Sequence, residues 1–202
     1  RFPDKAGDIS LSLHCETAEI MSAYTKIVEE EGTLKGLAAY SAGRPPHSEG
    51  LAIFIASYLA NETDLPNINL LHLTSRKAVL AALQMAAVFP HINFRREVTI
   101  GHLMLDTESK AASFAKVNPP IRSKREMESL WTHLAQGHIT VVSTDHVAWS
   151  EDRKVLPDML ANASGAPGLE VLYPLLLKGL VDRNLSLTWA PRLLAANPAQ
   201  LF

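Results

Sequence analysis

The order of apolar segments constrains the fold of this chain most, because short strand-like runs alternate with longer helical ones four times. Apolar residues at alternating or continuous positions predict strands over residues 9–14, 68–73, 94–100 and 138–144. Helical spacing predicts helices over residues 18–30, 50–61, 76–89, 124–136, 169–183 and 188–196. Strands joined by helical crossovers run parallel. The pattern therefore predicts an α/β fold with a parallel sheet, and four strand–helix units are half of an eight-unit barrel.

Local signals refine this outline. Ser75 is expected to cap the helix that follows it, because its hydroxyl can accept an otherwise unpaired amide proton. Gly137 is expected to end the helix over 124–136. Residues 43–49, which contain two prolines, predict a loop. The helix over 50–61 is apolar on most sides, so we expect it to be buried.

Composition excludes several function classes. The chain has 202 residues, 47% of them hydrophobic, with a net charge of −2. This composition is typical of one globular domain. The small negative charge provides no positive potential that would attract nucleic acid or an anionic membrane. A single cysteine, Cys15, excludes an internal disulfide and favours a reducing, cytoplasmic location. No apolar run approaches the roughly 20 residues of a membrane span, the first residues lack a secretory signal, and the missing initiator Met suggests a partial protein.

Side chains of types that commonly bind metal ions follow three of the four predicted strands. His14 closes the first strand, His72 the second, and Asp145 the fourth. Active sites of α/β barrels gather at the carboxyl ends of parallel strands. Imidazole and carboxylate groups are common zinc ligands, so the three side chains could converge on one metal. Alternatively, each residue only caps its strand.

The remaining candidates have simpler explanations. Solvation accounts for the histidines in predicted loops and at predicted helix ends, namely His47, His91, His133 and His138. His102 could point into the site or away from it. His146 should face away from Asp145, with a packing or outer hydrogen-bonding role, and Cys15 should be a small buried side chain. No Gly-x-Ser-x-Gly or Gly-rich phosphate loop is present, which disfavours a serine hydrolase and a nucleotide-binding sheet.

Six short motifs together resemble the cyclic amidohydrolases, the family of dihydropyrimidinase, hydantoinase, dihydroorotase and allantoinase. They occur in family order at residues 13–16, 71–75, 116–122, 143–146, 165–170 and 197–202. The resemblance implies a (β/α)8 TIM barrel of which strands five to eight are present. Residues 1–202 would form a single partial barrel domain, without the N-terminal half-barrel and a small β-rich domain.

The resemblance also implies roles for individual residues. His14 and His72 would hold the more exposed of two Zn²⁺ ions. Asp145 would bind the buried ion and, as the catalytic group, take a proton from the bridging hydroxide and pass it to the leaving nitrogen. Asn118 and Ser164 would contact the ring of a small cyclic amide substrate, Ser164 partly through its backbone.

Departures from the family pattern limit what the chain can do alone. It contains no His-x-His pair and no lysine in a suitable bridging position, Lys5 lying in a predicted loop. We therefore expect incomplete or absent metal binding, an inactive fragment, and a partner that is either a second copy or the missing half of its own chain. Residues 147–149 favour the dihydropyrimidinase or hydantoinase branch. The alternatives are a non-catalytic dihydropyrimidinase-like scaffold and an unrelated α/β binding module.

Overall fold

Four parallel strands form the sheet of this protein, whose computed structural model describes residues 10–200. They are arranged in sequence order: β1 (Ser10–Leu13), β2 (Asn67–Leu70), β3 (Asn93–Thr99) and β4 (Val141–Ser143). Each strand pairs in parallel with the next, with Leu13 opposite Leu70 and Thr99 opposite Ser143. The predicted parallel α/β sheet is confirmed, although residue 9 of the first predicted strand lies outside the described residues.

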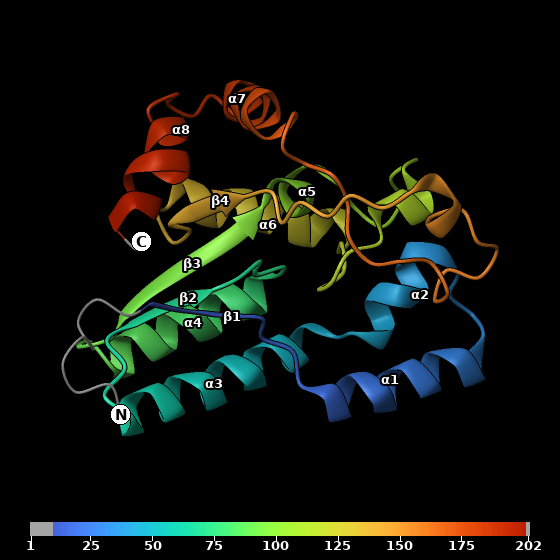
Figure 1. Cartoon of the computed structure of the whole chain (residues 1–202), viewed down its shortest axis with the longest axis horizontal. Helices are drawn as coiled ribbons and strands as arrows, with labels where there is room; N and C mark the ends of the chain where they lie inside the picture. Colours follow the sequence, from blue (N-terminus) through green and yellow to red (C-terminus); the bar gives the residue numbers. More distant parts are fainter. Residues whose placement is uncertain (1–9, 201–202) are drawn as a thin grey trace.

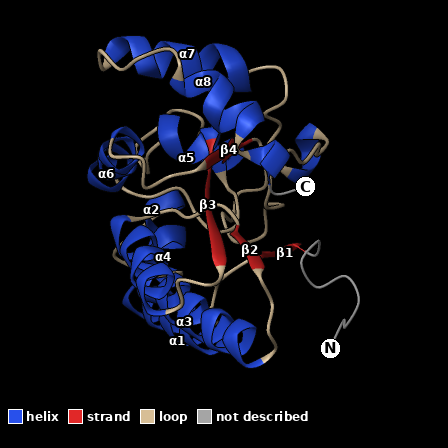
Figure 2. Ribbon diagram, turned by 90° about the vertical axis from the view of Figure 1, so that its left-hand side faces the viewer, coloured by secondary structure: helices blue, strands red, loops and turns tan. Residues whose placement is uncertain are grey.

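Helical crossovers connect the strands. β1 and β2 are joined through α1 (Ala18–Glu31), α2 (Gly36–Gly43) and α3 (Pro46–Glu62), β2 and β3 through α4 (Arg76–Val88), and β3 and β4 through α5 (Ile100–Met104) and α6 (Lys124–Ala135). After β4 come α7 (Leu172–Asp182), α8 (Trp189–Pro191), a π-helical turn, Arg192–Ala196, and a 3-10 turn, Pro198–Gln200 (Figure 1). Figure 2 shows α1, α3, α4 and α6 together on one side of the strands. None of the helices described between residues 10 and 200 is long and apolar enough to cross a bilayer.

The segment between β1 and β2 differs most from the prediction. Residues 36–43 form the unpredicted helix α2, and α3 begins at Pro46 rather than at residue 50. Proline fits there because the first turn of a helix leaves its amides unpaired. The predicted burial of α3 is wrong for much of its surface: Ile53 is fully buried, but the side chains of Tyr58 and Leu59 are more than half exposed. One face of α3 packs against the rest of the protein and the other does not.

Other predicted ends shift by a few residues. Ser75 caps α4 as predicted, accepting a hydrogen bond from the amide of Ala78 at 3.1 Å. Gly137 follows α6 with a φ of 76°, which glycine adopts without strain. The third strand ends at Thr99, because the Thr99 hydroxyl caps α5 directly.

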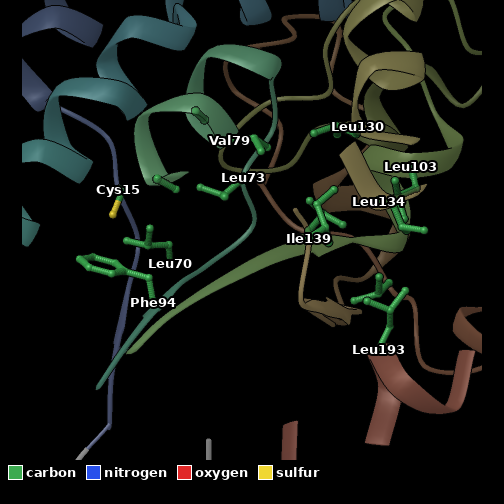
Figure 3. Close-up of a cluster of buried hydrophobic side chains, with 14 of the residues drawn as sticks. Cys15, Leu70, Leu73, Val79, Phe94, Leu103, Leu130, Leu134, Ile139 and Leu193 are labelled. Atoms are coloured by element: carbon green, nitrogen blue, oxygen red, sulfur yellow. The ribbon is translucent and has the colours of Figure 1, made fainter. Parts of the chain in front are cut away.

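Apolar side chains between the sheet and the helices form the core (Figure 3). Many of its almost fully buried members come from β2, β3 and β4 and from α3, α4, α5, α6 and α7. They include Ile53, Ile68, Leu70, Val79, Val98, Leu103, Leu130, Val142 and Leu180. Cys15 is buried beside this cluster, as predicted, and burial is the main cause that raises its pKa to about 12.

A buried ion pair ties α3 to the loop that precedes α6. Oε2 of Glu49 in the first turn of α3 lies 3.5 Å from the guanidinium of Arg122, and both residues are almost fully buried. The Thr74 hydroxyl, just after β2, donates to the Glu49 carboxylate at 2.7 Å and accepts from Arg122 Nε at 2.9 Å. Arg122 also donates to the backbone carbonyls of Ser41 and Arg44. One cation therefore holds α2, α3 and the end of β2 to this loop.

His102 anchors the same loop from the other side. Its Nε2 donates to the carbonyl of Pro119 at 3.0 Å, and its Nδ1 accepts from the Thr99 hydroxyl at 2.8 Å. The pKa of His102 is lowered to about 4, mainly by burial and further by the charge of Arg122. The sequence left open whether His102 points into the site or away from it. In the structure, both of its ring nitrogens form hydrogen bonds to Thr99 and to the Pro119 carbonyl.

Removing the Arg122 charge should make the protein easier to unfold. In Arg122→Met the Glu49 carboxylate would stay buried without its cation, and breaking such a pair costs about 3–5 kcal/mol. We expect the free energy of unfolding in urea to fall by that amount. As a control, Glu30→Gln removes the exposed i,i+4 partner of Lys26 and should change it by less than about 0.5 kcal/mol. Equal stability of the two variants would contradict the anchoring role of Arg122.

Acid should weaken the fold through His102. Between the ordinary histidine pKa near 6.5 and the folded value of about 4, the unfolded state binds a proton that the folded state does not, so stability falls as the pH falls. From pH 7 to pH 5, His102 should account for a loss of roughly 2 kcal/mol in the free energy of unfolding. His102→Gln, which cannot titrate but can still donate to Pro119, should lose correspondingly less. An identical pH dependence in both proteins would refute this assignment.

Candidate active site

Two predicted metal ligands, His14 and His72, face each other just beyond neighbouring strands. Leu13 at the end of β1 and Leu70 at the end of β2 are paired in register. Nδ1 of His14 lies 3.0 Å from Nε2 of His72, with the rings edge to face and their centroids 4.6 Å apart. Tetrahedral zinc with Zn–N bonds near 2.0–2.1 Å places two imidazole nitrogens roughly 3.3 Å apart. The spacing of the two nitrogens therefore fits a shared metal ion.

The surroundings of the two rings also suit metal ligands. The pKa of His72 is lowered to about 3, mainly by burial and next by the charge of His14. The ring is therefore neutral at physiological pH. The outer nitrogen of His14, Nε2, lies 2.9 Å from the Glu16 carboxylate, whose side chain is fully buried. Metal-binding histidines commonly carry a carboxylate on the second nitrogen, which fixes the orientation of the ring and raises its basicity.

Asp145 lies beyond β4 and stands apart from the histidine pair. It is exposed, and partial desolvation is the main cause that raises its pKa while the charge of His14 lowers it. Among residues 10–200, no three His, Cys, Asp or Glu side chains are close enough to hold one metal ion. The expected convergence of all three residues on one point is therefore not observed. β1 and β2 are direct neighbours, whereas β3 separates β4 from both.

His72 and Asp145 share an uncommon backbone conformation. Their φ angles are 38° and 46°, in the left-handed region that residues with a side chain seldom adopt. Such residues persist where the surrounding structure holds them in place, and they gather at functional sites. Asp64, Ala112 and Asn184 also have a positive φ, so this conformation is shared by the two strand ends but is not confined to them.

The two predicted substrate-binding residues, Asn118 and Ser164, meet at Tyr40 of α2. The Tyr40 hydroxyl donates to Oδ1 of Asn118 and lies 3.3 Å from Oγ of Ser164. Tyr40 is buried, and burial raises its pKa, so its hydroxyl keeps the proton that it donates. The carbonyl of Ser164 accepts from the Trp149 indole at 2.9 Å. Two loops far apart in the sequence thus present polar groups at one place.

Arg44 connects the tyrosine to the histidine pair. Its Nε donates to the Tyr40 hydroxyl at 3.3 Å, and its NH1 group lies 3.4 Å from the Glu16 carboxylate. Since Glu16 also contacts His14, polar contacts run without a break from the histidine pair to the two candidate substrate contacts. Tyr40 and Arg44 escape prediction because α2 has no recognisable boundary in the sequence. The prolines after Arg44 were the one available signal.

Three of the other histidines, His133, His138 and His146, make contacts within the fold. Nδ1 of His146 accepts from the backbone amides of Gly168 and Leu169 at 3.1 and 3.3 Å, whereas a hydrogen bond from His146 to a metal ligand stays a prediction. The predicted solvation of His133 is wrong, because this residue is buried. Its Nδ1 lies 2.9 Å from that of His138, near the amino end of β4 and thus at the opposite end of the strand from Asp145.

Relatives of known sequence align with almost the entire chain, although no protein-family model matches it. The chain is 32% identical over 197 residues to a dihydroorotase of Halobacterium salinarum and 29% identical over 198 residues to an allantoinase of Solibacter usitatus. Both alignments cover 96% of this chain, but only 43% and 42% of the two relatives. The chain therefore spans less than half the length of these proteins.

Solved structures show the same fold. The L-hydantoinase (dihydropyrimidinase) of Arthrobacter aurescens superimposes with a TM-score of 0.87 at 27% identity, over 97% of this chain and 44% of that one. The D-hydantoinase (dihydropyrimidinase) of a Thermus species gives 0.84 at 26% identity, over 96% and 43%. The four parallel strand–helix units are thus part of a TIM barrel. The order of the motifs, the aligned relatives and the shared fold agree, and the chain belongs to the cyclic amidohydrolase family.

Proposed function

We propose that this chain contributes metal ligands, a proton-transfer group and ring contacts to a metal-dependent hydrolase of cyclic amides. The contact between His14 and His72 carries the proposal, because it places two imidazole nitrogens 3.0 Å apart at the carboxyl ends of neighbouring parallel strands. The names of the relatives, dihydroorotase, allantoinase and hydantoinase, support a cyclic amide as the substrate class. Within that class we propose a dihydropyrimidine or a hydantoin.

The active protein needs more than this chain. The relatives are more than twice as long, and the described residues contain two facing metal ligands rather than a complete set. We therefore propose that the remaining ligands belong to the other half of the barrel, supplied by further sequence of the same polypeptide or by an associated copy. By itself the chain would be inactive.

In the assembled site, His14 and His72 would hold one zinc ion, and Asp145 would hold a second. When bound, the ions activate water as a nucleophile and polarise the amide carbonyl. Asp145 would take the proton of the attacking water and return it to the leaving nitrogen.

Asn118 and Ser164 would orient the ring. Because Oδ1 of Asn118 accepts a hydrogen bond from the Tyr40 hydroxyl, the orientation of the amide is set and its Nδ2 group can donate to a ring carbonyl. The Ser164 carbonyl, which already accepts from Trp149, has a second lone pair for a ring N–H. A cyclic amide presents this combination of an acceptor and a donor along one edge.

Metal binding should depend on both histidines. We expect His14→Ala and His72→Ala each to weaken Co²⁺ binding, followed by visible absorption and calorimetry, by about tenfold or more. His91→Ala, at an exposed position, is the matched control and should bind as the parent protein does. The same affinity in all three variants would show that the histidine pair is not a metal site.

Loss of the Asp145 carboxylate should abolish most of the turnover. In the intact protein we expect Asp145→Asn to lower kcat for cyclic amide hydrolysis by about 10²–10⁴-fold, the usual contribution of a positioned acid–base group. Asp182→Asn removes an exposed carboxylate of α7 and should leave kcat unchanged. If the intact parent protein with zinc hydrolyses no dihydropyrimidine, hydantoin, dihydroorotate or allantoin, the scaffold alternative gains support.

A further inference from the structure

Two buried lysines near the ring contacts form no ion pair with any carboxylate among residues 10–200, although the charge of Asp158 acts on Lys116. Lys116 is 4% exposed and Lys154 is 3% exposed. Within the described residues, neither lies within salt-bridge distance of an acidic group, although both are removed from water. A buried ammonium is costly unless its three N–H groups find acceptors. The acceptors here are backbone carbonyl oxygens.

Lys154 donates to three carbonyls that belong to two loops. Its Nζ lies 3.0 Å from the carbonyl of Lys116, 2.8 Å from that of Ala163 and 2.8 Å from that of Gly165. Lys116 precedes Asn118 by two residues, and Ala163 and Gly165 flank Ser164. The three donors of the ammonium are therefore all used in joining the two segments that carry the candidate ring contacts.

Further contacts join the same two loops. The amide of Gly165 donates to the carbonyl of Lys116 at 2.9 Å, so that carbonyl binds both the glycine and the Lys154 ammonium. Lys116 in turn donates from its own Nζ to the carbonyl of Leu160 at 2.8 Å. Gly165 has a φ of 127°, and a Cβ there would lie 2.6 Å from Val147, so no larger residue fits.

We propose that Lys154 is a positioning residue that sets the separation of Asn118 and Ser164, and thereby the fit of the substrate ring between them. The proposal rests on the proposed function for the identity of the ring, but the cross-link itself is a feature of this chain. Lys154 does not act as a nucleophile or base, because its three donors are taken up by carbonyls. An ammonium suits the task since its three donors point in different directions, whereas an arginine is a planar fork.

Hydrogen exchange measures the cross-link directly. In the intact protein, we expect Lys154→Met to speed exchange by about tenfold or more in peptides covering residues 112–118 and 160–168, because the ammonium contacts that hold these loops closed are lost. Peptides covering α6 should be unaffected. Lys178→Met, which removes an exposed lysine that pairs with Asp182, is the matched control. Unchanged exchange in both loops would overturn the proposal.

Kinetics separates positioning from a general effect on stability. We expect Lys154→Met to raise KM for the cyclic amide by about tenfold or more and to change kcat by less than about threefold, because the ring contacts are displaced while Asp145 is untouched. Lys154→Gln, which keeps two N–H donors, should lie between the parent and Lys154→Met, and it carries the test if the methionine variant does not fold. Faster loop exchange with unchanged KM would overturn the positioning role.

The two proposals can fail separately. If the parent protein hydrolyses no cyclic amide, the proposed function fails, and hydrogen exchange alone then decides whether Lys154 holds the loops of Asn118 and Ser164 together. If the parent is active and Lys154→Met matches it in both exchange and KM, the positioning role fails while the proposed function stands.

Discussion

Parallel pairing of consecutive strands brings every strand's carboxyl end to the same edge of the sheet, and the arrangement of the site depends on this constraint. The crossover helices return the chain to the amino end each time, so residues that follow the strands gather on one side. Direct neighbours bring their side chains into contact, as His14 and His72 show. Asp145 follows a strand that is two positions from β2 and three from β1. The charge of His14 acts to lower the pKa of Asp145, against the larger effect of partial burial.

Buried charges hold the loops that this sheet positions. Arg122 joins Glu49 to the carbonyls of two residues in and after α2, and Lys154 binds three carbonyls of two separate loops. Burying a charge is costly unless its hydrogen bonds are satisfied. Backbone carbonyls provide all three acceptors of Lys154 and two of the acceptors of Arg122. The same requirement therefore fixes the paths of the loops, because each carbonyl must stay within hydrogen-bonding distance of its cation.

Local sequence signals predicted the elements whose apolar residues recur with a regular period. The strands, the helices over α1, α4 and α6, and the Ser75 cap were found to within a few residues. α2 was missed because it is a short helix with neither a capping side chain nor a clear polar face. The burial of α3 and of His133 was misjudged for a related reason. Apolar content does not show which face a neighbouring element covers, and a position in a helix does not show what lies beside it.

The sequence by itself determined the α/β order of elements, the parallel sheet and the chemical types of the candidate ligands. Periodicity and residue chemistry are local properties, and the order of motifs along the chain identified the family. Tertiary structure decided which of these residues meet. His14 contacts His72, and Tyr40 lies between Asn118 and Ser164. Lys154 joins its own loop to Lys116, which is 38 positions away in the sequence. Such contacts depend on how strands pair and where loops close, and no local pattern encodes the resulting distances.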